Sequence, residues 1–143
     1  MGSVKAFGKL LALVLSTSLS VSSSADDPPS LLGEWRTEQS IFSENAKGKP
    51  RFSENVTTST IDVQNGRRFA GVTFKSAANR ETNVGNNRFV GMISADNASL
   101  YMVNGGGFID CRIMSAQHLD CQYRNPAAHK NATAIMSWRR TPP

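Results

Sequence analysis

Short runs of apolar and β-branched residues recur along the chain between residues 34 and 139. Val, Ile, Thr, Phe and Tyr dominate these runs, and Gly, Asn, Pro and Asp gather between them. No long stretch repeats with the period of a helix, so the pattern indicates an all-β domain. The expected strands are Glu34–Phe42, Val56–Val63, Arg67–Lys75, Arg88–Ser94, Ser99–Asn104, Phe108–Met114, His118–Arg124 and Asn131–Arg139.

Two kinds of connection separate these strands. Asn45–Asn55 and Ala77–Asn87 are polar and are predicted to be loops. Gln64–Gly66 and Asn104–Gly107 are rich in glycine, which suits tight hairpin turns. The expected arrangement is therefore an antiparallel meander, in which each strand pairs with the next.

A five-residue repeat relates two of the expected strands. Arg68–Val72 reads Arg-Phe-Ala-Gly-Val, and Arg88–Met92 reads Arg-Phe-Val-Gly-Met. In a strand, the Phe and the Gly two residues later share one face. Glycine inside a strand often marks a bend or a close approach, as a curved barrel wall requires.

The register of one hairpin follows from its residue pattern. Within Phe108–Arg124, a single antiparallel register places Cys111 opposite Cys121 and separates an apolar face from a polar one. We expect a Cys111–Cys121 disulfide, because opposed neighbours lie within bonding reach in an oxidising compartment. The alternative is two buried free thiols. The apolar pairs are Ile109–Tyr123 and Ile113–Leu119, and the polar pairs are Arg112–Asp120 and Asp110–Gln122.

The N-terminus has the three parts of a secretory signal peptide. Lys5 and Lys9 precede the apolar run Leu10–Leu15, and small residues lead up to Ala25. The apolar run is shorter than the roughly 20 residues of a membrane-spanning helix, so no membrane span is expected. We predict cleavage after Ala25 and a secreted or periplasmic protein.

Removal of 25 of the 143 residues leaves 118, a length suited to one domain. We expect an irregular leader at Asp26–Leu32 and a β-barrel domain at Gly33–Pro143. The remaining chain carries fourteen basic and eleven acidic residues, a net charge of +3. No dense basic face with interleaved aromatic residues is evident, so nucleic acid is not an expected partner.

The two ends of the domain resemble the calycin superfamily of small secreted barrels, which includes lipocalins and avidin-like proteins. Gly33 and Trp35 match the Gly-x-Trp of its first strand, and Arg139 or Arg140 matches the arginine that packs over that Trp from the last strand. The resemblance implies a single eight-stranded antiparallel up-and-down barrel with a binding role. Avidin-like sites use several Trp residues, whereas this chain has two, so biotin is not the expected ligand.

The face of the strands expected to point inward mixes apolar and small polar residues. If Trp35 points inward, alternation turns every second residue of that strand inward too. On the second strand we expect Ile61 and Val63 to share the inner face. The polar residues on these faces are candidate ligand-binding groups: Thr37, Gln39, Thr57, Ser59 and Thr73. The alternative is that their hydroxyls bond locally within the sheet.

Catalytic and metal-binding signals are weak. His118 and Asp120 share one face of a strand, but the sequence supplies no nucleophile beside them. His129 falls in an expected loop, and no Cys or His spacing suggests zinc. We expect no metal and no cofactor.

Three functions remain open. The first is a non-catalytic barrel that binds a small ligand in its interior or at its mouth. The second is an inhibitor or interaction module that engages an extracytoplasmic protein through its outer surface or through Asp26–Leu32, as some calycin-like protease inhibitors do. The third is an enzyme built on His118 and Asp120. The sequence sets no expectation for the oligomeric state.

Overall fold

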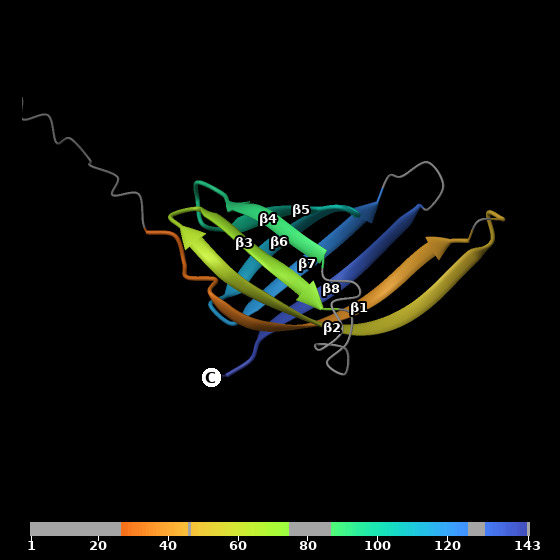
Figure 1. Ribbon diagram of the computed structural model, residues 1–143, viewed down its shortest axis with the longest axis horizontal. Coiled ribbons are helices and arrows are strands. Elements are labelled where there is room, and N and C mark those ends of the chain that lie inside the picture. The colour runs from red at the N-terminus through yellow and green to blue at the C-terminus, as the bar shows by residue number, and fades with distance from the viewer. Residues whose placement is uncertain (1–26, 46, 75–86, 126–130, 143) are drawn as a thin grey trace, which may run out of the picture.

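A computed structural model describes residues 27–45, 47–74, 87–125 and 131–142. The predicted signal peptide, the cleavage site after Ala25 and His129 lie outside the described residues. Eight antiparallel strands form a closed barrel in which each strand pairs with its neighbours in sequence (Figure 1). They are β1 Gly33–Glu44, β2 Pro50–Asn65, β3 Arg68–Phe74, β4 Asn87–Ile93, β5 Ser99–Asn104, β6 Gly107–Ser115, β7 His118–Asn125 and β8 Ala132–Arg140. The predicted up-and-down barrel is confirmed.

The barrel closes where β1 meets β8. Trp35 pairs with Arg140 in an antiparallel register. The Trp35 side chain is fully buried, and the guanidinium carbon of Arg140 lies 4.9 Å from the centre of its ring. The predicted contact is therefore confirmed and belongs to Arg140, whereas Arg139 is exposed. Such a cation–π contact contributes about 0.5–2 kcal/mol.

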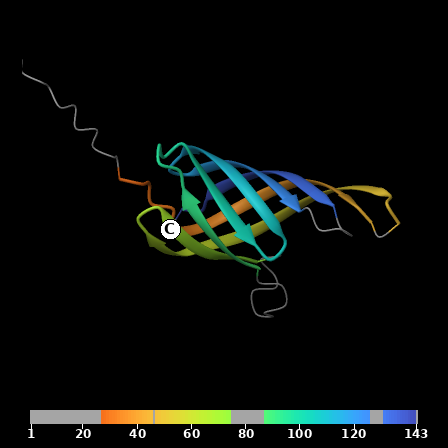
Figure 2. The same ribbon diagram turned by 90° about the horizontal axis from the view of Figure 1, so that it is seen from above.

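The segment before β1 lies at this end of the barrel (Figure 2). Leu31 is buried beside Trp35, and its carbonyl accepts a hydrogen bond of 2.9 Å from Trp35 Nε1. The Leu31 amide donates to Gln64 Oε1 at 2.7 Å, and Gln64 Nε2 donates to the Pro29 carbonyl at 3.0 Å. Side-chain and backbone hydrogen bonds thus fix Pro29–Leu32 across the barrel end.

The hairpin register predicted for β6 and β7 is confirmed. Cys111 pairs with Cys121, and the two form a disulfide with Cα atoms 4.0 Å apart. Their side chains are buried in the core, together with Ile109 and Leu119. Disulfides are typical of proteins from oxidising compartments outside the cytoplasm.

The five-residue repeat forms a reciprocal packing motif between β3 and β4. Phe69 pairs with Gly91, and Gly71 pairs with Phe89. Each phenyl ring therefore covers the glycine of the neighbouring strand. A Cβ atom added at Gly71 would lie 2.5 Å from the tip of the Phe89 ring, and one added at Gly91 would overlap Phe69. Glycine is needed here for the close approach that the sequence indicated.

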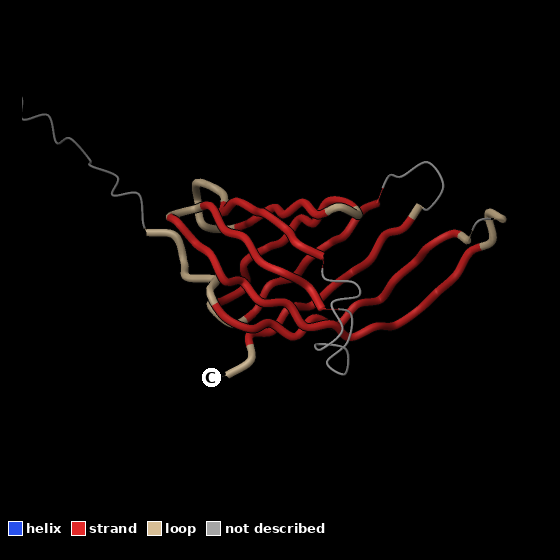
Figure 3. The backbone as a smooth tube through the Cα atoms, viewed as in Figure 1, coloured by secondary structure: helices blue, strands red, loops and turns tan. Residues whose placement is uncertain are grey.

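The β1–β2 hairpin is longer than the sequence predicts. Pro50–Asn55 was expected in a loop, but it continues β2, and the pairing extends to Glu44 with Pro50. Figure 1 and Figure 3 show this hairpin running past the ends of β3–β6, at the opposite end from the leader. The hydrophobic pattern did not indicate this part of β2, because Arg51–Val56 is exposed on both faces and lacks apolar alternation.

A β-bulge changes the orientation of one predicted core residue. The β2–β3 register shifts between Ile61 and Val63. Ile61 is buried as expected, but Val63 is exposed, because the extra residue reverses the alternation. The predicted strand Ser99–Asn104 coincides with β5, and the other predicted strands differ from the observed ones by at most two residues at either end. Lys75 and most of Ala77–Asn87 lie outside the described residues, and Asn87 begins β4.

The Phe–Gly motif predicts the effect of adding one methyl group. Gly71→Ala should destabilise the barrel by about 1–3 kcal/mol, because the core cannot admit the methyl without displacing Phe89 or the β2 backbone. Urea unfolding measures the change. Gly105→Ala is the matched control, since the closest atom to its added Cβ is 4.0 Å away. Equal stability of the two variants would contradict the motif.

Candidate functional site

A cavity of about 240 Å³ lies inside the barrel, toward the end from which the β1–β2 hairpin extends. Most of its wall is amide, hydroxyl and aromatic side chains, and none of its lining residues is Asp, Glu, Lys, Arg or His. The lining residues are Gln39, Asn55, Thr57, Thr73, Asn87, Asn104, Ile109, Tyr123, Met136 and Trp138.

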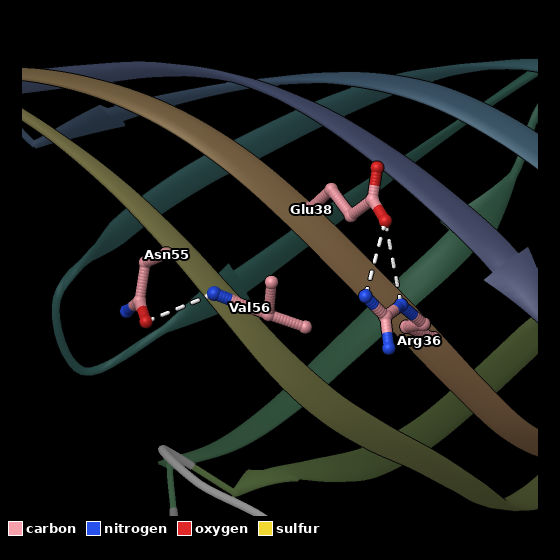
Figure 4. A network of polar contacts seen from close by, with 4 residues as sticks. All are labelled: Arg36, Glu38, Asn55 and Val56. Atoms are coloured by element: carbon pink, nitrogen blue, oxygen red, sulfur yellow. Dashed lines mark hydrogen bonds and ion pairs between the residues drawn. The ribbon is translucent and has the colours of Figure 1, made fainter.

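Three of the predicted ligand-binding residues line this cavity: Gln39, Thr57 and Thr73. Gln39 Nε2 donates a hydrogen bond of 2.9 Å to Thr57 Oγ1. Alternation on β1 places Gln39 inward, because Arg36 and Glu38 form an exposed ion pair on the outer face of that strand (Figure 4).

The other two predicted residues lie deeper in the barrel. Thr37 pairs with Thr57, and Ser59 pairs with Trp35 in the next row toward the sealed end. The Ser59 hydroxyl forms a hydrogen bond of 2.9 Å with that of Thr73. Ser59 therefore matches the alternative of local hydroxyl bonding, and it does not line the cavity.

Two asparagines of the wall use their side-chain oxygens to hold the backbone. Asn55 Oδ1 accepts from the Val56 amide at 2.9 Å (Figure 4). Asn104 Oδ1 accepts from the amides of Gly106 and Gly107 at 2.8 and 2.9 Å. Neither amide nitrogen donates a hydrogen bond to another described residue. Both asparagines therefore keep their amide nitrogens as available donors.

Two buried polar atoms beside the cavity have no hydrogen-bond partner among the described residues: Trp138 Nε1 and Thr37 Oγ1. Trp138 lines the cavity, is 2% exposed and pairs with Thr37 across β8 and β1. Leaving a buried donor unpaired costs about 1–3 kcal/mol. The Trp138 ring is also fixed by an edge contact with Phe89, at 6.0 Å between ring centres. Trp138 therefore combines a ring that lines the cavity with a rigid, buried donor that has no partner among the described residues.

Tyr123 contributes an uncharged side chain to the wall of the same cavity. Its hydroxyl donates a hydrogen bond of 2.8 Å to the Gly106 carbonyl. Burial raises the pKa of Tyr123 above its usual value, although a hydrogen bond with Asn125 opposes the change. The phenol therefore stays protonated and uncharged at neutral pH.

Sequence reasoning missed seven of the lining residues. Asn55, Asn87 and Asn104 were expected in loops or turns, where no alternation defines a face. Trp138 was considered only as part of the closing motif. A usable signal did exist for β8, because alternation from Trp138 turns Met136 inward. The last two missed lining residues are Ile109 and Tyr123. Both were expected on the apolar inner face of the barrel, but neither was expected to line a ligand-binding cavity.

His118 does acquire a neighbouring hydroxyl in the structure. Its Nε2 lies 2.8 Å from Asp120 Oδ1 and 3.2 Å from Ser137 Oγ. A nucleophile–base–acid relay needs the carboxylate on one ring nitrogen and the hydroxyl on the other. Here both contact the same nitrogen, on the outer face of the barrel. The arrangement suits a surface hydrogen-bond cluster, and it lacks the geometry of a catalytic triad.

Among the described residues, no group of three or more His, Cys, Asp or Glu side chains is arranged to hold a metal ion. The same part of the chain includes no helix with the length and hydrophobicity of a membrane span. Comparison with protein-family models, with curated proteins and with solved structures finds no match for this chain.

The burial of Tyr123 predicts a late phenol titration. In an absorbance titration near 295 nm, one tyrosine should ionise above the usual range, because its charged form is poorly solvated. Tyr123→Phe should remove this late transition, and Tyr101→Phe should leave it in place. A late transition that survives in Tyr123→Phe would contradict the assignment.

Proposed function

We propose that this protein is a non-catalytic binding barrel that takes a small, uncharged, polar ligand in the cavity at its open end. The observation that carries the proposal is the unpaired Trp138 Nε1, which is buried in the cavity wall. A ligand oxygen that accepts from this nitrogen recovers the cost of the unpaired donor. The ligand class is thus one that carries a carbonyl, ether or hydroxyl oxygen.

The lining explains why the ligand is uncharged. No acidic or basic side chain lines the cavity to pair with an ion, and an unpaired charge is costly to remove from water. The Asn55 and Asn104 amide nitrogens add further donors. Trp138 and Tyr123 supply aromatic surface between the polar groups. A few oriented polar groups on an apolar wall are typical of small-molecule sites.

The state of the leader supports binding in the interior over inhibition through the leader. In the inhibitor alternative, Asp26–Leu32 enters the cleft of a partner protein. Leu31 is 1% exposed, and Pro29 and Leu31 are hydrogen-bonded to Gln64 on the barrel. Extracting this segment would uncover Trp35 and open the core. The outer surface remains available to a protein partner.

We further propose that the barrel is calycin-like and that the protein is secreted or periplasmic. The first proposal is supported by the up-and-down closure and by Arg140 over Trp35. The second is supported by the expected signal peptide before Asp26 and by the Cys111–Cys121 disulfide.

Native mass spectrometry of the protein purified from its own host tests the proposed function. We expect a retained small molecule of neutral charge. Trp138→Phe keeps the ring but removes the donor, so it should weaken binding of that molecule roughly 10- to 100-fold. The same variant should retain its thermal stability, because it also removes an unpaired buried group.

An isosteric pair provides the control. Thr57→Val changes the cavity wall, whereas Thr58→Val changes the neighbouring position on the other face of β2. Only the first should alter ligand binding. A protein that carries no small molecule, or one whose ligand binds Trp138→Phe as tightly as the unaltered chain, would refute the proposal.

A further inference from the structure

A continuous apolar area covers the outer face of β2–β6, away from the cavity. Of the twelve exposed large apolar side chains, six fall in adjacent rows of these strands, and we call these six the apolar outer face. Isolated exposed apolar residues are common on monomers, but contiguous ones mark interaction surfaces. The residues of the apolar outer face are Val63, Val90, Met92, Tyr101, Val103 and Phe108.

The strand register aligns these side chains in two adjacent rows. One row crosses β2–β6 through Val63, Ala70, Val90, Val103 and Phe108. A groove of about 510 Å³ follows this face, and its wall is almost entirely apolar. The exposed fractions, 58% for Val90 and 42% for Val103, show that the core does not need these side chains.

The second row has a charged residue of opposite sign at each end, and these charges bear on which binding partner would fit this face. It runs from Arg68 on β3 through Met92 and Tyr101 to Asp110 on β6. Arg68 forms no ion pair with another described residue. Asp110 contacts Arg124 through Oδ2, and its Oδ1 accepts no hydrogen bond from the described part of the chain. One face therefore presents an available cation and an available carboxylate oxygen on opposite flanks of an apolar centre.

We propose that the apolar outer face binds a second copy of this chain in a two-fold symmetric dimer. A two-fold axis parallel to the strands, between β4 and β5, places each Arg68 against Asp110 of the other copy. The same rotation sets Val90 against Val103 and Met92 against Tyr101. A partner with a single sign of charge would leave one flank mismatched.

This arrangement leaves the proposed ligand site accessible. The axis runs parallel to the strands, so both barrels keep the same direction and both open ends lie at one end of the dimer. The interface lies on the outer face, whereas the cavity lies inside, so dimerisation does not depend on the proposed function. Enrichment in Tyr, Met, Phe and Arg, with no lysine among these residues, also suits a protein interface.

Sedimentation velocity over a range of concentrations tests the proposal. The unaltered protein should sediment as a dimer, and Val90→Asp should weaken the dimer by tenfold or more, because it buries an unpaired charge. Ile135→Asp is the matched control: Ile135 is 73% exposed but lies on β8, so this variant should remain dimeric. A monomer at all concentrations, or a dimer that tolerates Val90→Asp, would overturn the proposal.

A charge exchange tests the symmetry. Arg68→Asp and Asp110→Arg should each weaken the dimer, since each places like charges together across the axis. The double variant should recover much of the lost affinity. Circular dichroism checks that each variant retains its β-sheet content. Single variants without effect, or a double variant weaker than both, would contradict the two-fold arrangement.

Discussion

The contact between Trp35 and Arg140 joins the two ends of the domain, at one end of the β1–β8 ladder that closes the barrel. Trp35 lies at the start of β1 and Arg140 at the end of β8, so only closure brings them together. The buried indole also donates to Leu31, whose side chain and backbone complete the seal. One aromatic side chain thus links the first strand, the last strand and the leader.

This seal gives the barrel two unlike ends. Around Trp35 and Leu31 the interior is filled with apolar side chains, as a stable core requires. At the other end, Asn, Gln and Thr side chains surround a cavity, and Trp138 Nε1 is left unpaired. The filled end provides most of the apolar core, and the open end holds the cavity. Such a division is expected where a binding site is built on a rigid scaffold. Unpaired buried polar atoms occur at both ends, because Arg140 Nε beside Trp35 also has no partner among the described residues.

Local patterns predicted the structure well, and features without a local pattern escaped prediction. The Cys111–Cys121 register followed from alternation within one hairpin. Arg140 was distinguishable from Arg139, because it shares a face with Trp138, but this signal was not used. Pro50–Asn55 lacked any apolar residue that faces a core. The outward turn of Val63 depends on a bulge, which tertiary pairing decides. The cavity asparagines come from different strand ends that only closure brings together.

A double-mutant cycle between Trp35 and Arg140 tests the central claim, that these two residues stabilise each other where β1 meets β8. Trp35→Leu keeps apolar bulk but removes the aromatic face, and Arg140→Ala removes the guanidinium. Urea unfolding of the single and double variants should give a coupling free energy of about 0.5–2 kcal/mol. The same cycle with Arg139→Ala should give none, because Arg139 points to the outside. Equal coupling to both arginines, or coupling to neither, would contradict this account of closure.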